Sequence, residues 1–123
     1  MNSFPIVSSV LVAIVAFIHI YILILEMFLW DKPTGLKAFG QTLEVARASK
    51  TLAANQGLYN GFLSAGLFWG LYLGEAGGYA VKLFFLICII LAGIYGGITA
   101  KRKILYVQAA PAIIAAIAVM LNI

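Results

Sequence analysis

Residues 51–74 read TLAANQGLYNGFLSAGLFWGLYLG, an apolar stretch with a polar cluster near its start. Because a helix rises about 1.5 Å per residue and a hydrocarbon core is about 30 Å thick, roughly 20 such residues span a bilayer. Two Asn, one Gln and one Tyr fall within residues 55–60. An amide buried in hydrocarbon without a hydrogen-bond partner is costly. We therefore expect neighbouring helices to satisfy this cluster.

Three more stretches of similar length occur at about residues 6–30, 78–100 and 104–123. The chain has 123 residues, of which 64% are hydrophobic, whereas soluble domains are about 45–50% apolar. Two of the three connections are very short, so consecutive helices have to lie antiparallel to one another. The sequence predicts an all-α membrane protein in which residues 1–123 form a single domain, a small antiparallel bundle of four transmembrane helices.

Lys and Arg are distributed unevenly among the connections. The cations of the first connection and of the third are Lys32, Lys37, Arg47, Lys50, Lys101, Arg102 and Lys103. Lys82 alone follows the second span, and no cation follows the fourth. Cytoplasmic loops carry the excess of Lys and Arg. We expect loops 1 and 3, the former at about residues 31–50, to be cytoplasmic and both termini to lie outside.

The first connection begins with Asp31-Lys32-Pro33-Thr34-Gly35, whose composition predicts a turn. Residues 41–50 favour a helix, with Glu44 and Arg47 three apart on one face. Two arrangements are open: the second long helix starts early and projects from the membrane, or a short interfacial helix is followed by a bend before Thr51.

Small residues mark the expected helix contacts. Gly57 and Gly61 lie four apart, and Gly93 and Gly97 repeat that spacing in the third span. Helices in lipid approach one another through such residues, and we expect these contacts to form within the chain rather than between copies. Pro111 removes a backbone hydrogen bond and should kink the fourth helix.

Glu26 and His19 are the candidate catalytic residues. They lie seven apart, which places them on one helix face about 10 Å from each other along the axis. An ionisable residue inside a membrane span is a functional candidate by default. Two structural alternatives are open: Glu26 pairs with Lys50 or Lys103 at the interface, and His19 is a neutral core histidine.

The remaining polar side chains fall at a depth similar to that of Glu26. Measured at 1.5 Å per residue from the cytoplasmic ends, all four spans contribute polar groups to the cytoplasmic half. The candidate ligand-binding residues are Asn55, Gln56, Tyr59, Asn60, Tyr95 and Gln108. The candidates on the second span are also suited to a purely structural role, in which their hydrogen bonds hold the helices together.

Several classes of site are disfavoured. Cys88 is the only cysteine, which leaves no intramolecular disulfide and no cysteine-based metal centre. Glu26 and His19 are too far apart to share a metal ion without further ligands, so we expect no metal site. The net charge of +4 is explained by topology, and we expect no nucleic-acid partner. The sequence names no cofactor and shows no complete catalytic constellation, so it leaves open whether the protein is an enzyme.

Several motifs together resemble the bacterial integral-membrane family known as domain of unknown function 1304. They are His19 with LEMFLW at residues 25–30, ANQGLYNGFL at 54–63, AGIYG at 92–96, and RKIL at 102–105 with Gln108 and Pro111. The resemblance implies a multi-pass protein of the bacterial plasma (inner) membrane with four helices. It implies no substrate or reaction.

Three functions are compatible with this pattern. The first is a polar intramembrane site, open toward the cytoplasm, that binds a small-molecule or lipid-like ligand, with Glu26 as acid or base and His19 as its partner in proton transfer. The second is a small proton-coupled transporter or exporter, in which a homo-oligomer would enclose the path. The third is a structural or accessory membrane protein, whose main partner is the lipid bilayer.

Overall fold

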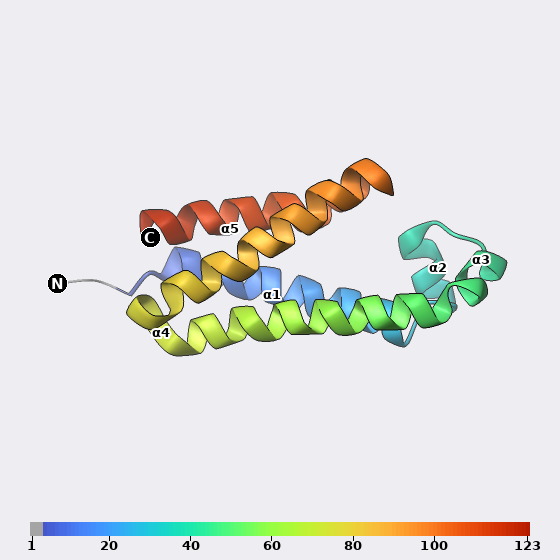
Figure 1. Cartoon of the computed structure of the whole chain (residues 1–123), viewed down its shortest axis with the longest axis horizontal. Helices are drawn as coiled ribbons and strands as arrows, with labels where there is room; N and C mark the ends of the chain where they lie inside the picture. The colour runs from blue at the N-terminus through green and yellow to red at the C-terminus, as the bar shows by residue number, and fades with distance from the viewer. Residues whose placement is uncertain (1–3) are drawn as a thin grey trace. The chain divides into compact units, whose positions relative to one another are not determined.

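The computed structural model describes residues 4–123, and every regular element in that range is a helix. The elements in chain order are α1 (Ile6–Met27), α2 (Pro33–Phe39), α3 (Leu43–Ala48), α4 (Lys50–Thr99), the π-helix η1 (Leu105–Ala109) and α5 (Ala110–Leu121) (Figure 1). The all-α prediction is confirmed. The chain divides into two compact units, residues 4–18 with Leu63–Ile123, and His19–Phe62. The assignment of residues 1–123 to one domain stays a prediction.

Two helices, α1 and α4, are long and apolar enough to cross a membrane. The segment Leu105–Leu121 is apolar but shorter. α4 has 50 residues and is interrupted by non-helical backbone at Gly74, with φ 83° and ψ −163°. That conformation is essentially confined to glycine. Helical geometry resumes at Glu75, so the break is shorter than the connection expected at residues 75–77.

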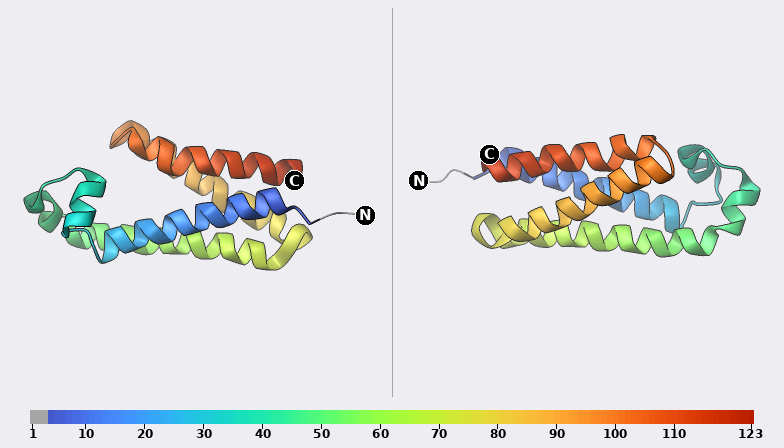
Figure 2. Two further views of the ribbon diagram at one scale, coloured as in Figure 1. Left: turned by 180° about the vertical axis from the view of Figure 1, so that it is seen from behind. Right: turned by 45° about the horizontal axis from the view of Figure 1, so that its top comes forward.

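The two arms of α4 fold back on each other beside Gly74, at the yellow part of the ribbon in Figure 2. A Cβ atom on Gly66 would overlap the ring of Phe85, and one on Gly78 would overlap the carbonyl oxygen of Gly70. Side chains at these glycines are therefore excluded by direct contact between the arms. The predicted role of small residues as packing positions within the chain agrees with these contacts.

The core of the larger unit lies between α1, the two arms of α4, and α5. It consists of aliphatic side chains that are at most 5% exposed: Val12, Val15, Ala16, Leu67, Leu86, Ile89, Ala112, Ala115, Ala116 and Val119. The Ser64 hydroxyl donates a hydrogen bond of 2.8 Å to the Ala16 carbonyl oxygen. Gly93 packs against Ala109, since a Cβ atom there would lie 2.6 Å from the Ala109 nitrogen. Small residues thus bring α5 and α1 close to α4, as expected for helices in lipid.

The predicted irregularity at Pro111 coincides with a change of helix type. η1 covers Leu105–Ala109, and α5 begins at Ala110 with the proline in its first positions. Proline has no N–H to donate to the preceding turn. It is therefore tolerated at the start of α5, where the π-helix ends.

The connection between α1 and α4 holds two short helices. Pro33 stands at the first position of α2, so the expected turn at residues 31–35 gives way to a helix. The Thr42 hydroxyl accepts a hydrogen bond from the Val45 N–H and caps α3. α3 ends at Ala48 and α4 starts at Lys50. Of the two arrangements left open by the sequence, the structure has the short separate helix.

Candidate functional site

Glu26 lies at the carboxyl end of α1, in the unit His19–Phe62. The helix ends one residue later, where the N–H groups of Phe28 and Leu29 both bond to the Ile24 carbonyl oxygen at 3.0 and 3.2 Å. The Glu26 side chain points inward and is only 4% exposed. A carboxyl group is rarely buried to this degree unless it has a hydrogen-bond partner.

That partner is Asn60 of α4. Its Nδ2 atom donates a hydrogen bond of 2.6 Å to Glu26 Oε1, and Asn60 itself is 6% exposed. The bond joins residues 34 positions apart, so it ties the end of α1 to α4. It satisfies one carboxyl oxygen and leaves the other available to a further donor or proton.

Gly57 explains why the two helices approach so closely here. A Cβ atom at this position would lie 2.7 Å from Met27 Cγ, 3.0 Å from Glu26 Cβ and 3.3 Å from the Leu23 carbonyl oxygen. Gly57 precedes Asn60 by three residues, so both lie on the same face of α4. The glycine admits the stem of Glu26, and the asparagine meets its carboxyl group one turn later.

His19 is fully buried and lies two turns before Glu26 on α1. This separation corresponds to about 10 Å along the helix, so the imidazole and the carboxyl group are neighbours on one face rather than direct partners. Among residues 4–123, no three His, Cys, Asp or Glu side chains gather closely enough to hold a metal ion.

The other candidate residues occupy different positions. Asn55 and Gln56 are exposed, and Asn55 Nδ2 donates to the Thr51 carbonyl oxygen of its own helix at 2.9 Å. Tyr59 is 58% exposed, and its ring lies 6.2 Å from that of Phe62. Of the polar cluster at residues 55–60, Asn60 is the member brought to Glu26. Tyr95, which is 72% exposed, and the half-buried Gln108 belong to the other unit.

The connecting segment is fastened next to the end of α1. Trp30 Nε1 donates to Ser49 Oγ at 3.1 Å, and the Trp30 ring packs on Phe39 with centroids 4.7 Å apart. Lys50 Nζ lies 3.2 Å from Asp31 Oδ2. The hydrogen bond from Lys50 holds the pKa of Asp31 below its ordinary value. Lys50 is thus paired with Asp31 rather than with Glu26, which removes one of the two interfacial partners considered for Glu26.

Two residues of functional interest were not among the candidates from sequence. Gly57 shapes the Glu26 site, and the signal available was its spacing of three from Asn60 on an otherwise apolar helix. Lys82 had been counted with the outer connection, yet it is 5% exposed and lies inside the second arm of α4. The signal available there was its apolar setting, between Val81 and Leu83.

The comparisons with known proteins assign a family. A family model described as "Protein of unknown function (DUF1304)" matches residues 13–120. The chain belongs to this family. The uncharacterized protein YpaA of Lactococcus lactis subsp. lactis (strain IL1403) is similar, with 37% identity over 119 residues that cover 95% of this chain and 97% of YpaA. No solved structure matches the DUF1304 chain significantly.

Proposed function

We propose that this DUF1304 protein is a multi-pass protein of the bacterial inner membrane that binds a small or lipid-like ligand at Glu26. The observation that carries the proposal is the Glu26–Asn60 hydrogen bond of 2.6 Å between two side chains that are each at most 6% exposed. Helix contacts in lipid are usually made by small residues, and Gly57 already supplies one here. Close packing of α1 on α4 does not require a carboxyl group, so the buried Glu26 side chain is available for binding or proton transfer.

In this proposal each polar residue has a role. Glu26 exchanges a proton with the ligand or accepts its hydrogen bond, Asn60 orients the carboxyl group, and His19 passes protons along the same helix face. Exposed groups on α4 in the same unit complete the ligand contacts. They are Asn55, Gln56 and Tyr59.

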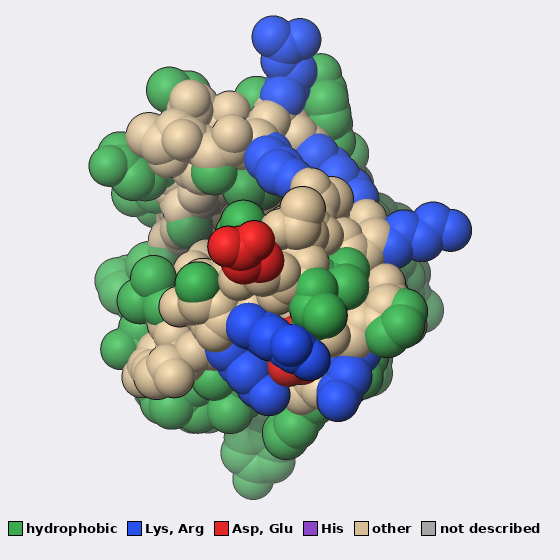
Figure 3. All heavy atoms as spheres, turned by 90° about the vertical axis from the view of Figure 1, so that its right-hand side faces the viewer, with side chains coloured by type: hydrophobic (Ala, Val, Ile, Leu, Met, Phe, Trp, Pro, Cys, Tyr) green, Lys and Arg blue, Asp and Glu red, His purple; other side chains and the backbone are tan. Residues whose placement is uncertain are grey.

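The proposed topology has four transmembrane helices: α1, the two arms of α4, and η1 with α5. Loops 1 and 3 are cytoplasmic, and both termini are outside. Support comes from the seven Lys and Arg of those loops, which are all exposed, whereas Lys82 is buried. Exposed Lys and Arg side chains stand on the face shown in Figure 3. On this topology the Glu26 site lies near the cytoplasmic surface.

Cysteine labelling tests the topology. Thr34→Cys in loop 1 and Ala76→Cys beside the Gly74 turn are made separately in a Cys88→Ser background. We expect an impermeant reagent added outside intact cells to label Ala76→Cys and to leave Thr34→Cys unlabelled until the cells are lysed. Labelling of Thr34→Cys from outside would reverse the orientation.

Native mass spectrometry of the gently solubilised protein tests the ligand site. We expect the wild type to retain a small molecule and Glu26→Gln, which keeps the shape of the side chain, to lose it. Glu44→Gln is the matched control, because Glu44 is an exposed carboxylate on α3. Full retention of the molecule by Glu26→Gln would exclude Glu26 from the site, and no retained mass in any variant would favour a structural role.

A proton-coupled transporter is the second candidate, and the burial of Lys82 favours it. Ionisable residues inside a membrane span often mark ion and proton pathways, and Lys82 is such a residue, lining a cavity together with Gly74. Uptake or efflux by proteoliposomes that depends on a pH gradient and disappears in Glu26→Gln would establish transport in place of ligand storage.

A further inference from the structure

Lys82 is a buried cation in the unit formed by residues 4–18 and Leu63–Ile123. Its side chain is 5% exposed. The stem packs on Gly70 of the opposite arm of α4, where a Cβ atom would lie 2.6 Å from Lys82 Cγ and 3.2 Å from its backbone nitrogen. Within residues 4–123, the Lys82 ammonium group has no hydrogen-bond or ion-pair partner. Its nitrogen is not one of the fully buried polar atoms of the described residues that lack a partner, so it is open to an approaching anion, with which a charge-assisted hydrogen bond would form.

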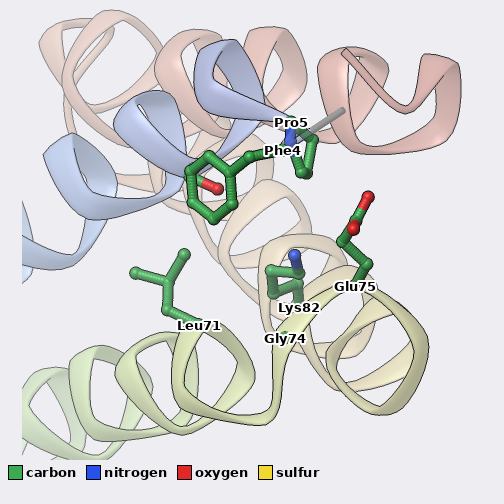
Figure 4. Close-up of a pocket in the computed structure, with 7 residues that line it drawn as sticks. Phe4, Pro5, Leu71, Gly74, Glu75 and Lys82 are labelled. Carbon is green, nitrogen blue, oxygen red and sulfur yellow. The ribbon is translucent and has the colours of Figure 1, made fainter. Parts of the chain in front are cut away.

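Lys82 lines a cavity of about 120 Å³ at the Gly74 turn. Its apolar walls come from Phe4, Pro5 and Leu71, and its polar groups from Ser9, Glu75 and Lys82. Figure 4 shows the Lys82 side chain extending from the second arm of α4 toward Phe4 and Pro5. Because a cavity needs roughly 10–15 Å³ to hold one water molecule, this cavity has room for a small charged group but not for a whole lipid.

The charges around the cavity restrict that group. Glu75 stands two turns before Lys82 on the same arm and is exposed, so it contributes negative charge at the rim. A doubly charged anion is repelled by Glu75 more strongly than a singly charged one. Ser9 also lines the cavity and contributes a hydroxyl group that can donate a hydrogen bond. One cation, one donor and a negative rim fit an oxyanion with a single charge.

The surroundings of the cavity are apolar. Phe4, which lines it, is 68% exposed. An acyl chain attached to the bound group would cover such side chains and gain about 25 cal/mol for each Å² of apolar surface removed from water. A soluble anion would make no use of them.

We propose that Lys82 binds the singly charged oxyanion headgroup of an acyl lipid, either a carboxylate or a phosphodiester, in the cavity at the Gly74 turn. Ser9 donates a hydrogen bond to the headgroup, and the tail lies along the exposed apolar residues at the rim. This site is made entirely by one compact unit and is independent of the ligand proposed for Glu26.

Native mass spectrometry of the full chain in an uncharged detergent tests this proposal by titration with defined lipids. The anionic probes are oleate and dioleoyl phosphatidylglycerol, which separate the carboxylate from the phosphodiester. The neutral counterparts are oleyl alcohol and dioleoyl phosphatidylcholine, and inorganic phosphate reports a soluble anion. We expect at least one anionic lipid to bind about tenfold more tightly than its counterpart, since a hydrogen bond to a charged group contributes roughly that factor or more.

Variants connect the binding to Lys82. Lys82→Met keeps the length of the side chain without its charge and should weaken binding of the anionic lipid about tenfold. Lys37→Met removes an exposed cation from α2 and should leave the affinity unchanged. Glu75→Gln alters an exposed side chain and should strengthen binding about threefold, because it removes negative charge at the rim. It also tests the site if Lys82→Met does not fold.

Three results would overturn the proposal. The first is equal affinity of wild type and Lys82→Met for oleate and phosphatidylglycerol. The second is equal affinity of the wild type for the charged lipids and their neutral counterparts. The third is binding of inorganic phosphate as tight as that of the lipids, which would leave no role for the acyl chain.

Discussion

Glu26 and Lys82 are both buried against a glycine of α4, but they differ in what their charged groups meet. Each is a charged residue type that is at most 5% exposed, and each packs its stem on a glycine of α4, Gly57 for Glu26 and Gly70 for Lys82. Glu26 meets an amide donor at 2.6 Å, whereas Lys82 faces a cavity. A glycine on the facing helix thus gives a long polar side chain room to enter the interior, and the group at its tip decides whether burial is stabilising. The site with an internal partner should resist change, and the site without one should depend on what binds.

The largest expected effect comes from filling the two glycine positions. Gly57→Val and Gly70→Val each introduce a Cβ atom less than 3.0 Å from a neighbouring side chain, which overpacks the contact and should cost about 3 kcal/mol. Unfolding of the purified protein in mixed micelles by dodecyl sulfate measures this cost. Gly77→Val is the control, because a Cβ atom there meets only Leu73 at an ordinary 3.5 Å. Equal stability of all three variants would refute the role given to the glycines.

The second largest effect tests the hydrogen bond that the Glu26 carboxyl group has and the Lys82 ammonium group lacks. Asn60→Leu removes the donor to Glu26 and leaves its carboxyl group buried without that partner, so the free energy of unfolding should fall by about 2 kcal/mol. The same dodecyl sulfate titration measures the change. Asn55→Leu is the matched control, since the Asn55 amide bonds only within its own helix. A loss in Asn55→Leu as large as that in Asn60→Leu would contradict a special role for the buried bond.

Lys82→Met should change the free energy of unfolding in the opposite direction to Asn60→Leu. In detergent without added anionic lipid, it replaces the charge on a side chain that is only 5% exposed by an apolar group of similar length and should raise the free energy of unfolding by about 1 kcal/mol. Addition of phosphatidylglycerol or oleate should stabilise the wild type and not the variant. Destabilisation by Lys82→Met in the absence of lipid would show that the ammonium group already has a stabilising partner.

The smallest effect concerns the surface pair beside the Glu26 site. The hydrogen bond from Lys50 lowers the pKa of Asp31 from its ordinary 3.8. A carboxyl group whose pKa is lower in the folded state stabilises the protein above its ordinary pKa, and this contribution is lost as the pH falls through the folded value. Asp31→Asn should therefore lower the melting temperature slightly at pH 7 and not at pH 2. An equal effect at both pH values would assign the contribution to packing.

The sequence was sufficient to predict the helical class and to include Glu26 and Asn60 in a larger set of candidate residues. Long apolar stretches and buried polar residues are properties of single helices, and they can be read from composition and period. The pairing was not predictable, because Asn55, Gln56, Tyr59 and Asn60 cover an arc of about 140° and the rotation of α4 against α1 chooses among them. That rotation is set by contact at Gly57, a tertiary feature.

The position of Lys82 was missed for a related reason. The expected third span, residues 78–100, contains Lys82 near its start, and the distribution of Lys and Arg alone assigned this lysine to the connection before it. In the structure Gly78 instead lies in contact with Gly70, and the chain reverses one turn earlier. Glycine thus makes the turn at Gly74 and a close helix contact at Gly78, and these two roles are distinguished only by the backbone conformation.

The reversal at Gly74 also has a mechanical consequence. Because one residue with φ 83° makes the turn, the flanking arms have no spare chain between them. The two arms are therefore held together close to Gly74, where Gly78 contacts Gly70. The Pro5 carbonyl oxygen accepts hydrogen bonds from the Ser8 hydroxyl and the Ser9 N–H, so this edge of the Lys82 cavity is in turn fixed to α1.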